Sequence, residues 1–311
     1  MSLLSLIAVF LIEQLQPLDY RRRVAGPLGA WADYIESRCN AGGSRHGALA
    51  WCLAVLPPMA LLVAVYAACH AVGPLLVWLL NVGVLYLTMG FRQFSHHYTD
   101  IQLALRLGDL PRARELLGEW LDRPAGDLGS GEIARLSIEE ALAASHRHVF
   151  AVLFWFVILP GPCGALLYRL AAALRERWGE AGGRAVHEFS DAFPNFARRV
   201  FGIIDWLPSR ATAVAFAIVG DFEDAVHCWR TQPAQWPDRD LGIVLASGAG
   251  ALGVQLGRSM ADGAGGAGSG ELGVGDPPDV DSMQSAVGLV WRATVLWGLM
   301  LFLLVLASLA G

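Results

Sequence analysis

One long apolar stretch, residues 149–174, constrains the fold of this chain more than any other feature. It has 26 residues and a single charged side chain, Arg169, so it is long and apolar enough to enter a bilayer core of about 30 Å. Pro160, Gly161 and Pro162 lie at its centre. A proline removes a backbone donor and clashes with the preceding turn, so an unbroken helix is not expected there. The stretch predicts either a kinked spanning helix or a re-entrant pair of half-helices around a binding site.

The composition supports a membrane protein whose main partner is the lipid bilayer. Hydrophobic residues make up 55% of the 311 residues and charged residues only 16%, whereas soluble proteins carry about 25% charge. The net charge of −5 argues against a nucleic-acid partner. All 23 basic residues are arginine, which excludes a lysine nucleophile. The five cysteines lack CxxC spacing, so neither a disulfide framework nor a zinc site is expected.

Further apolar runs complete the expected architecture. They lie at 2–12, 49–71, 75–90, 200–219, 241–256 and 286–309, and Pro57-Pro58 should kink or break the second of them. We therefore expect an all-α, polytopic integral membrane helical bundle of five to seven membrane segments, with a broken or re-entrant central segment. The whole chain, 1–311, forms one domain in this interpretation, and residues 261–280 form a flexible glycine-rich loop.

The longest polar segment, 91–148, is expected to be a helical cap. Apolar residues recur in it at helical spacing, and residues 108–111, Gly-Asp-Leu-Pro, separate two helices. Asp109 suits the N-cap of the second helix and Pro111 its first turn. Arginines number seven in this segment, five in 16–48 and none in 70–74, so the positive-inside rule places the cap in the cytoplasm of a bacterial inner membrane. Five more arginines in 175–199 favour the re-entrant alternative.

Four segments carry a resemblance to a known family. They read GPCGALLYR at 161–169, DWLPSR at 205–210, SGAGALGVQLG at 247–257 and GDPPDVDSM at 275–283. In this order the chain resembles the CobD/CbiB family of cobalamin-biosynthesis membrane proteins, and it is also similar to the related AmpE family. The CobD/CbiB resemblance implies an amide-forming C–N ligase, similar to cobinamide-phosphate synthase, that attaches aminopropanol or its phosphate to a corrinoid. ATP and magnesium are implied only if that activity is retained.

The chain departs from the family pattern where acidic and amide side chains are usual. The Glu-Asn-Thr-x-Asp-Gly run is replaced by ASHRHV at 144–149, and Asn-Thr-x-Asp-Ser by AALRE at 172–176. Phe201-Gly202 stands for a pair of aspartates and Leu245 for a glutamate. Such oxygen ligands could hold magnesium and phosphate, so their loss argues against ligase activity. Two hypotheses follow: a divergent CobD/CbiB-family protein connected with cobalamin biosynthesis, or an AmpE-like, non-enzymatic membrane regulator linked to cell-wall recycling.

The candidate ligand-binding residues begin with three charges beside apolar runs. Charges at membrane depth are costly and often functional, so Arg169 and Arg210 could bind a small anionic ligand. The alternative for Arg169 is an arginine whose head group snorkels to the interface. Asp205 could pair with Arg210, which favours a structural role for both. The sharper hypothesis places all three at the mouth of a polar pocket formed by the break at Pro160–Pro162.

Histidines and aspartates complete the candidates. His96 and His97, with His146 and His148, could bind a metal or titrate near neutral pH, but no carboxylate or cysteine spacing supports a metal. We expect them to be interfacial histidines. Asp276, Asp279 and Asp281 could bind a cation with Asp262, but they precede a predicted helix, so capping is favoured.

Overall fold

The computed structural model describes residues 2–15, 24, 26–39, 44–184, 192–257 and 270–310. Within this part of the chain the regular elements are helices, accompanied by two isolated β-bridges, which confirms the all-α fold class. The chain divides into two compact units. The first comprises Met1–Gly90 and Ala151–Pro208, and the second Phe91–Phe150 and Ser209–Gly311.

Four helices of the described residues have the length and apolar character needed to cross a bilayer. They span His46–Val72, Ser130–Ile158, Asn195–Val219 and Val280–Ala307, and two shorter apolar helices span Leu4–Glu13 and Pro74–Thr88. The apolar run 241–256 has a different role. It forms α12 (Arg239–Leu252), whose residues from Gly242 to Ala251 are all buried. A helix of this length is too short to span a membrane and is a core helix of the second unit.

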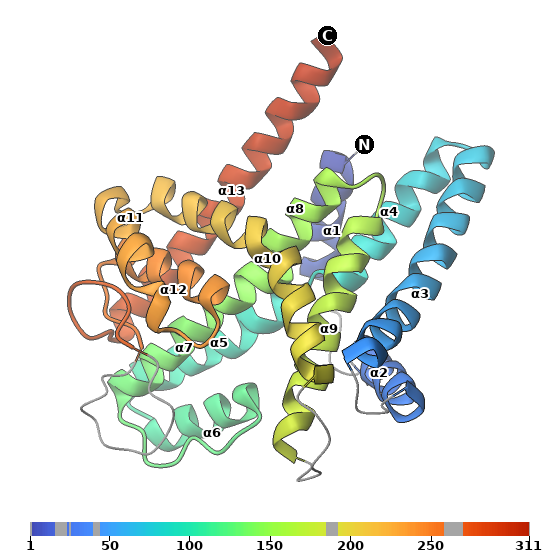
Figure 1. Cartoon of the computed structure of the whole chain (residues 1–311). Coiled ribbons are helices and arrows are strands. Elements are labelled where there is room, and N and C mark those ends of the chain that lie inside the picture. Colours follow the sequence, from blue (N-terminus) through green and yellow to red (C-terminus); the bar gives the residue numbers. More distant parts are fainter. Residues whose placement is uncertain are drawn as a thin grey trace. The chain divides into compact units, whose positions relative to one another are not determined.

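The first unit is built on α9. Its helices are α1 (Ser2–Leu15), α2 (Gly26–Cys39), α3 (Ser44–Val72), α4 (Pro74–Thr88), α8 (Ala151–Ile158), α9 (Cys163–Arg184) and the start of α10 (Ala192–Val219). α9 packs on α2 and α3 (Figure 1), with Trp178, Leu174 and Leu170 in the shared core. The Trp178 indole donates to the carbonyl oxygen of Ala32 at 3.3 Å, which fixes α2 on α9.

The central apolar stretch reverses direction at its Pro-Gly-Pro sequence. α8 ends at Ile158, α9 begins at Cys163, and Gly161 adopts a positive φ of 64° in the turn between them (Figure 1). The two helices lie so close that a Cβ on Gly164 would overlap the carbonyl oxygen of Trp155. The kinked-helix alternative is therefore wrong, and the break is a helical hairpin.

The helices that flank this turn are longer than the half-helices expected. The first runs without interruption from Ser130 to Ile158, and α9 has 22 residues. The helix passes through residue 148 and does not end at the polar side chains before it. A five-residue π-helical segment, η2 (His146–Phe150), instead joins α7 (Ser130–Ser145) to α8.

Prolines inside two helices of the first unit are accommodated by tryptophan side chains. A proline at position i leaves the carbonyl of residue i−4 without its helical donor. Pro58 of α3 frees the carbonyl of Ala54, which accepts a hydrogen bond from the Trp31 indole at 3.0 Å. Pro208 of α10 frees that of Ile204, which accepts from the Trp155 indole at 3.2 Å. The break expected at Pro57-Pro58 is consequently absent, and α3 is a continuous helix.

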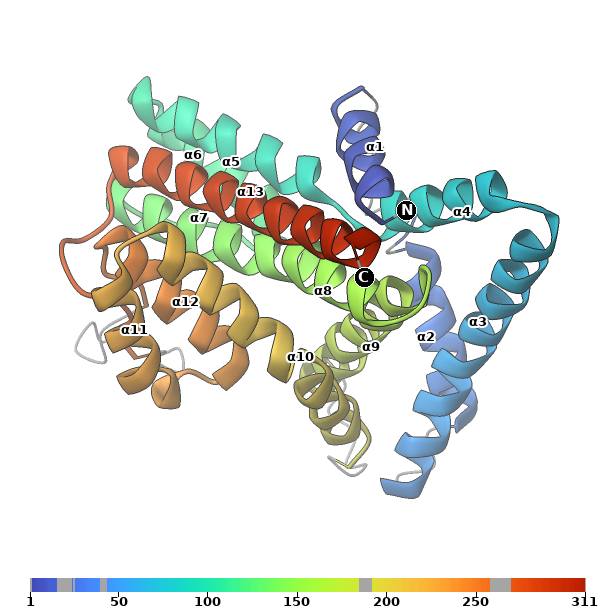
Figure 2. The same ribbon diagram turned by 90° about the horizontal axis from the view of Figure 1, so that it is seen from above.

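The second unit surrounds α7 and α12. Its helices are α5 (Phe91–Arg106), α6 (Leu110–Leu121), α7, η2, the end of α10, α11 (Phe222–Thr231), η3 (Pro233–Gln235), α12 and α13 (Val280–Ala310). Figure 2 shows α13 lying along α5 and α7. The predicted helix pair is confirmed: Asp109 caps α6 by accepting from the Arg112 N–H at 3.1 Å, and Gly108 has a positive φ. The cytoplasmic location of this pair stays a prediction.

The glycine-rich sequence of α12 permits close packing. A Cβ on Gly250 would collide with the backbone of Asp224 in α11, and one on Gly248 with the Leu142 side chain of α7. After α12, Leu256 and Leu272 exchange two backbone hydrogen bonds, and the Gln255 N–H donates to the Asp276 carbonyl. Residues 270–280 are therefore held in place, unlike the flexible loop expected at 261–280, whose part up to residue 269 lies outside the described residues.

Candidate functional site

The first candidate site is a buried polar cluster between α9 and α10 in the first unit. We call it the Tyr168–Asp205 cluster, and its members are Tyr168, Phe201 and Asp205. The buried Arg169 follows Tyr168 in the chain. The Tyr168 hydroxyl donates to Asp205 Oδ1 at 2.9 Å. Tyr168 is fully buried, while Arg169 is 5% exposed and Asp205 2%. Phe201 and Asp205 lie one helical turn apart, and the Phe201 ring packs against the Tyr168 ring at 5.7 Å.

Arg169 and Asp205 place both signs of charge inside the protein. Burying a charge costs free energy unless hydrogen bonds or an opposite charge compensate it. The Tyr168 hydrogen bond supplies part of that compensation for Asp205. Beside it, the Arg175 guanidinium stacks over the Phe201 ring at 4.8 Å. The chemistry of the cluster suits recognition of a carboxylate or phosphate by arginine, with Tyr168 holding Asp205 in one orientation.

The turn at Pro160–Pro162 does not form part of this cluster. A Cβ on Gly161 would meet the Tyr66 ring of α3 at 2.6 Å, so the turn is packed against protein. Arg169 lies nearly two helical turns further along α9. The buried charges therefore belong to the facing sides of α9 and α10 and not to the ends of two half-helices.

A second polar cluster lies in the second unit at the start of α12. We call it the Arg210–Asp240 cluster, and its members are His146, Arg147, Arg210, Thr212, Asp238 and Asp240. Arg210 Nη1 lies 2.9 Å from Asp240 Oδ1, and Arg147 Nη2 lies 4.0 Å from Asp238 Oδ2. Asp238 also caps α12 by accepting from the backbone N–H of Asp240 and Leu241. The four charged side chains of the cluster are between 17% and 23% exposed, so solvent reaches them.

Asp205 and Arg210 each have a partner that the sequence did not indicate, and their expected pairing with each other stays a prediction. Asp205 binds Tyr168 in the first unit and Arg210 binds Asp240 in the second. The partners could not be read from the sequence, because 37 and 30 positions separate them. The sequence did hold a signal for the role of Asp238 as a helix cap, because it directly precedes an apolar helix and aspartate is a favoured N-cap.

His146 is the member of the second cluster that differs most from expectation. It is fully buried in η2, and its Nδ1 lies 2.9 Å from the Thr212 hydroxyl of α10. The sequence did not indicate this burial, which neighbouring helices produce, and the location of His146 at a membrane interface stays a prediction. π-Helical turns are rare in proteins, and those that occur often lie at functional sites. His146 therefore remains a candidate ligand-binding residue.

The remaining candidates are dispersed. His97 of α5 stacks on Trp120 of α6 at 6.2 Å, and His96 is exposed. Asp279 caps α13 by accepting from the backbone N–H and the hydroxyl of Ser282, which holds the pKa of its carboxyl below its ordinary value. Asp281 lies in the first turn of α13, and Asp276 forms a backbone bridge with Val254. Capping is thus confirmed for Asp279, and Asp262 lies outside the described residues.

Sequence reasoning missed a contact made by Glu139, the second of three glutamates in α7. Glu139 Oε1 accepts from Arg135 Nη1 at 2.8 Å and from the backbone N–H of Gly257 at 2.8 Å. It therefore ties the glycine-rich segment after α12 to α7. Gln232 has a similar role, because its amide donates to and accepts from the backbone of Gly273.

The described residues do not form a metal site built from protein side chains alone. Across the described ranges, no three His, Cys, Asp or Glu side chains come together as metal ligands would. In the Arg210–Asp240 cluster each carboxylate faces an arginine, and Asp238 is also engaged at a helix terminus. We therefore derive no reaction step through a bound metal ion.

Comparisons with known proteins agree on one family. The model of the CobD/Cbib protein family matches residues 17–290. The cobalamin biosynthesis protein CobD of Stutzerimonas stutzeri is 34% identical over 302 residues, which cover 96% of each chain. CobD of Chromobacterium violaceum is 38% identical over 224 residues, covering 72% of this chain and 70% of that one. CbiB of Salmonella typhimurium is 25% identical over 217 residues, covering 68% and 66%.

The match to CobD of Stutzerimonas stutzeri extends over nearly the full length of both proteins. No solved structure matches the chain significantly. The comparisons give no support to the AmpE alternative. On a family match that covers most of its length, and on relatives that are 34% and 38% identical, this chain belongs to the CobD/CbiB protein family.

Proposed function

We propose that this protein acts in cobalamin biosynthesis as a multi-pass protein of the bacterial inner membrane. The observation that carries the proposal is the similarity to CobD of Stutzerimonas stutzeri over 96% of both chains. Four helices long and apolar enough to cross a membrane support the location, and the arginine-rich polar segments support the inner membrane.

Within this function we propose that Arg169 in the first unit and Arg210 in the second are each a separate candidate for binding an anionic group of a small ligand or of a corrinoid. Guanidinium groups match carboxylates and phosphates in shape and charge. Arg169 is almost completely buried, and charged groups inside membrane proteins commonly mark functional sites. Arg210 is 22% exposed, so a ligand can reach it. Tyr168 holds the Asp205 carboxylate in one orientation by donating a hydrogen bond to it.

We further propose that this chain does not itself form the amide that the family resemblance implies. His146, Arg147 and His148 stand where that resemblance expects acidic and amide side chains, and His146 is engaged with Thr212. A basic and histidine-rich segment cannot supply the oxygen ligands that magnesium prefers.

A gene deletion with feeding tests the pathway and the amide step separately. The deletion strain should fail to grow where growth depends on its own corrinoid synthesis, and the wild-type gene should restore growth. Cobinamide already contains the amide, so a strain that lacks only the amide-forming step will be rescued by it. Rescue by cobinamide alone, and by no earlier corrinoid, would assign the amide step to this chain and overturn our exclusion of it. Normal growth of the deletion strain would refute the pathway itself.

A further inference from the structure

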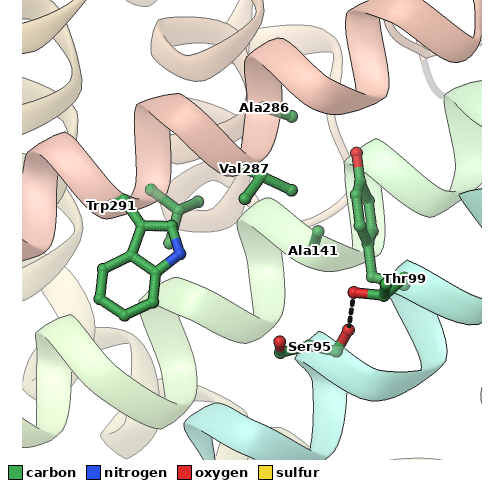
Figure 3. Close-up of a pocket in the computed structure, with 8 residues that line it drawn as sticks. Ser95, Thr99, Ala141, Ala286, Val287 and Trp291 are labelled. Carbon is green, nitrogen blue, oxygen red and sulfur yellow. Dashed lines mark hydrogen bonds between the residues drawn. The ribbon is translucent and has the colours of Figure 1, made fainter.

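A small apolar cavity lies between α5, α7 and α13 in the second unit. Its volume is about 50 Å³, and its lining residues include Ser95, Thr99, Ala141, Ala286 and Trp291 (Figure 3). Val287 and Val290 of α13 and Tyr98 of α5 complete the lining. The space exists because alanines of α7 and α13 lie where larger side chains would fill it.

The cavity favours an apolar occupant over water. A water molecule takes about 10–15 Å³ by this measure and needs two to four polar partners. The walls offer chiefly alkyl and indole surface. The Tyr98 hydroxyl is engaged, because it donates to the carbonyl oxygen of Met283 at 2.8 Å. Thr99 likewise donates to the carbonyl of Ser95 at 2.8 Å. A run of a few methylene groups fits both the volume and the walls.

The elements around the cavity place it at the edge of a membrane. Ala286, Val287, Val290 and Trp291 belong to the first twelve residues of the candidate span Val280–Ala307. Ser95 and Thr99 belong to α5, which is not among the candidate spans and carries charged residues at both ends. A cavity between a spanning helix and a polar helix lies where lipid meets water.

The cavity is continuous with the apolar face of α13. Trp291 at the cavity is 44% exposed, and it begins a stripe of exposed side chains spaced three or four residues apart. The stripe continues with Val295, Leu299, Phe302 and Leu306, which are 67%, 52%, 46% and 46% exposed. Spacing of three and four residues keeps these side chains on one face of the helix. On a membrane-crossing helix this face contacts lipid chains.

We propose that one acyl chain of a membrane phospholipid lies along this stripe and enters the cavity. The apolar lining, the volume and the continuity with the lipid-facing stripe favour a hydrocarbon chain over a soluble ligand. The lipid acts as a fixed part of the second unit, because it fills the space between α5, α7 and α13. This inference is independent of the proposed pathway and of the arginine sites.

Native mass spectrometry of the full-length protein tests the occupant. The protein is reconstituted in vesicles of phosphatidylethanolamine and phosphatidylglycerol and then transferred into detergent. We expect one phospholipid to stay bound to the wild-type protein. Ala286→Leu and Ala141→Leu fill the cavity and should reduce its occupancy at least tenfold. Val295→Leu, on the stripe outside the cavity, should keep it. Equal retention in all variants, or adducts of detergent alone, would overturn the proposal.

A measurement on the unaltered protein guards against misfolded variants. A phospholipid with a diazirine at the end of one acyl chain is added to the same vesicles, and its cross-links are mapped after illumination. Cross-links to residues 286–291 and to 95–99 are expected, because the chain end lies inside the cavity. Cross-links confined to residues 295–306 would show that lipids only coat the stripe, and the proposal would be wrong.

Discussion

Arg169 and Arg177 show how the same residue type on one helix can differ in role. Arg169 is buried, whereas Arg177 is 49% exposed and forms a two-point ion pair with Asp33. An exposed ion pair contributes little to stability. A buried charge costs free energy, and in membrane proteins such a charge often has a function. The two residues therefore form a matched pair of variants on α9.

We expect Arg169→Gln to abolish corrinoid-dependent growth, because a neutral amide cannot bind an anion as a guanidinium does. Arg177→Gln should complement a deletion strain fully. Growth is scored together with the amount of protein in the membrane, so that loss of folding is separated from loss of binding. Full complementation by Arg169→Gln at normal membrane levels would show that its buried charge is structural.

At the level of residues the sequence indicated unusual charged side chains, but it did not indicate their partners. Arg169, Asp205 and Arg210 were singled out because charges beside apolar runs are unusual, and each has an ionic or hydrogen-bonded role. The pairs Tyr168–Asp205 and Arg210–Asp240 depend on tertiary packing, which no local pattern encodes. The burial of His146 was not indicated for the same reason, since neighbouring helices produce it.

At the scale of helices, the pairing of tryptophans with proline-freed carbonyls explains how α3 and α10 stay continuous. Helix-breaking residues are tolerated where another donor satisfies the freed carbonyl. The sequence predicts a kink or break at Pro57-Pro58. It does not reveal the indole donors that satisfy the freed carbonyls, because these donors come from other helices. A reversal of the chain at Pro160–Pro162 was part of one of two alternatives, and the structure has that reversal. The half-helices that the same alternative expected are absent from the described residues, because the flanking helices are longer.

A double-mutant cycle tests this arrangement at Pro208. Trp155→Phe should lower the free energy of unfolding by about 1 kcal/mol, because the Ile204 carbonyl loses its donor. In a Pro208→Ala background the alanine N–H supplies that donor, so the same change should cost less. Unfolding in detergent is followed by circular dichroism.

The control for this cycle is Trp51→Phe. Among the described residues the indole nitrogen of Trp51 has no hydrogen-bond partner. Removing this N–H should therefore leave the free energy of unfolding nearly unchanged. An equal cost of Trp155→Phe in both backgrounds would contradict the proposed role of the indole.

The contact between α2 and α9 predicts a dependence of stability on pH. The Arg177 guanidinium hydrogen-bonds the Asp33 carboxylate and holds the pKa of Asp33 below its ordinary value. The contribution of the pair is therefore present above the unfolded pKa, about 4, and is lost as the pH falls through the lowered folded value. The melting temperature of the wild type should exceed that of Asp33→Asn by a small amount at about pH 6, and the difference should close towards about pH 3. A difference in melting temperature that does not change with pH would show that packing, and not the ion pair, produces it.

For the whole molecule, the sequence predicted the membrane class and the helical content, because both follow from composition and apolar run length. It did not predict the division into two units, each assembled from two separated segments of the chain. The run 241–256 illustrates the limit, since apolar residues alone do not separate a spanning helix from α12, a helix buried in protein.

Cysteine labelling in whole cells tests the predicted topology. In a variant without its native cysteines, Leu110→Cys at the start of α6 should react only after the inner membrane is permeabilised, because the arginine distribution places it in the cytoplasm. Gly73→Cys, between α3 and α4, should react from the outside and serves as the control. Labelling of position 110 in intact cells would reverse the topology.

If this membrane protein takes part in cobalamin biosynthesis, the cobalamin content of cells should depend on it. The gene is deleted in its own bacterium, and cobalamin is quantified by mass spectrometry after growth without added corrinoids. We predict that cobalamin falls below detection and that the wild-type gene returns it to its original level. An unchanged cobalamin content in the deletion strain would contradict the account.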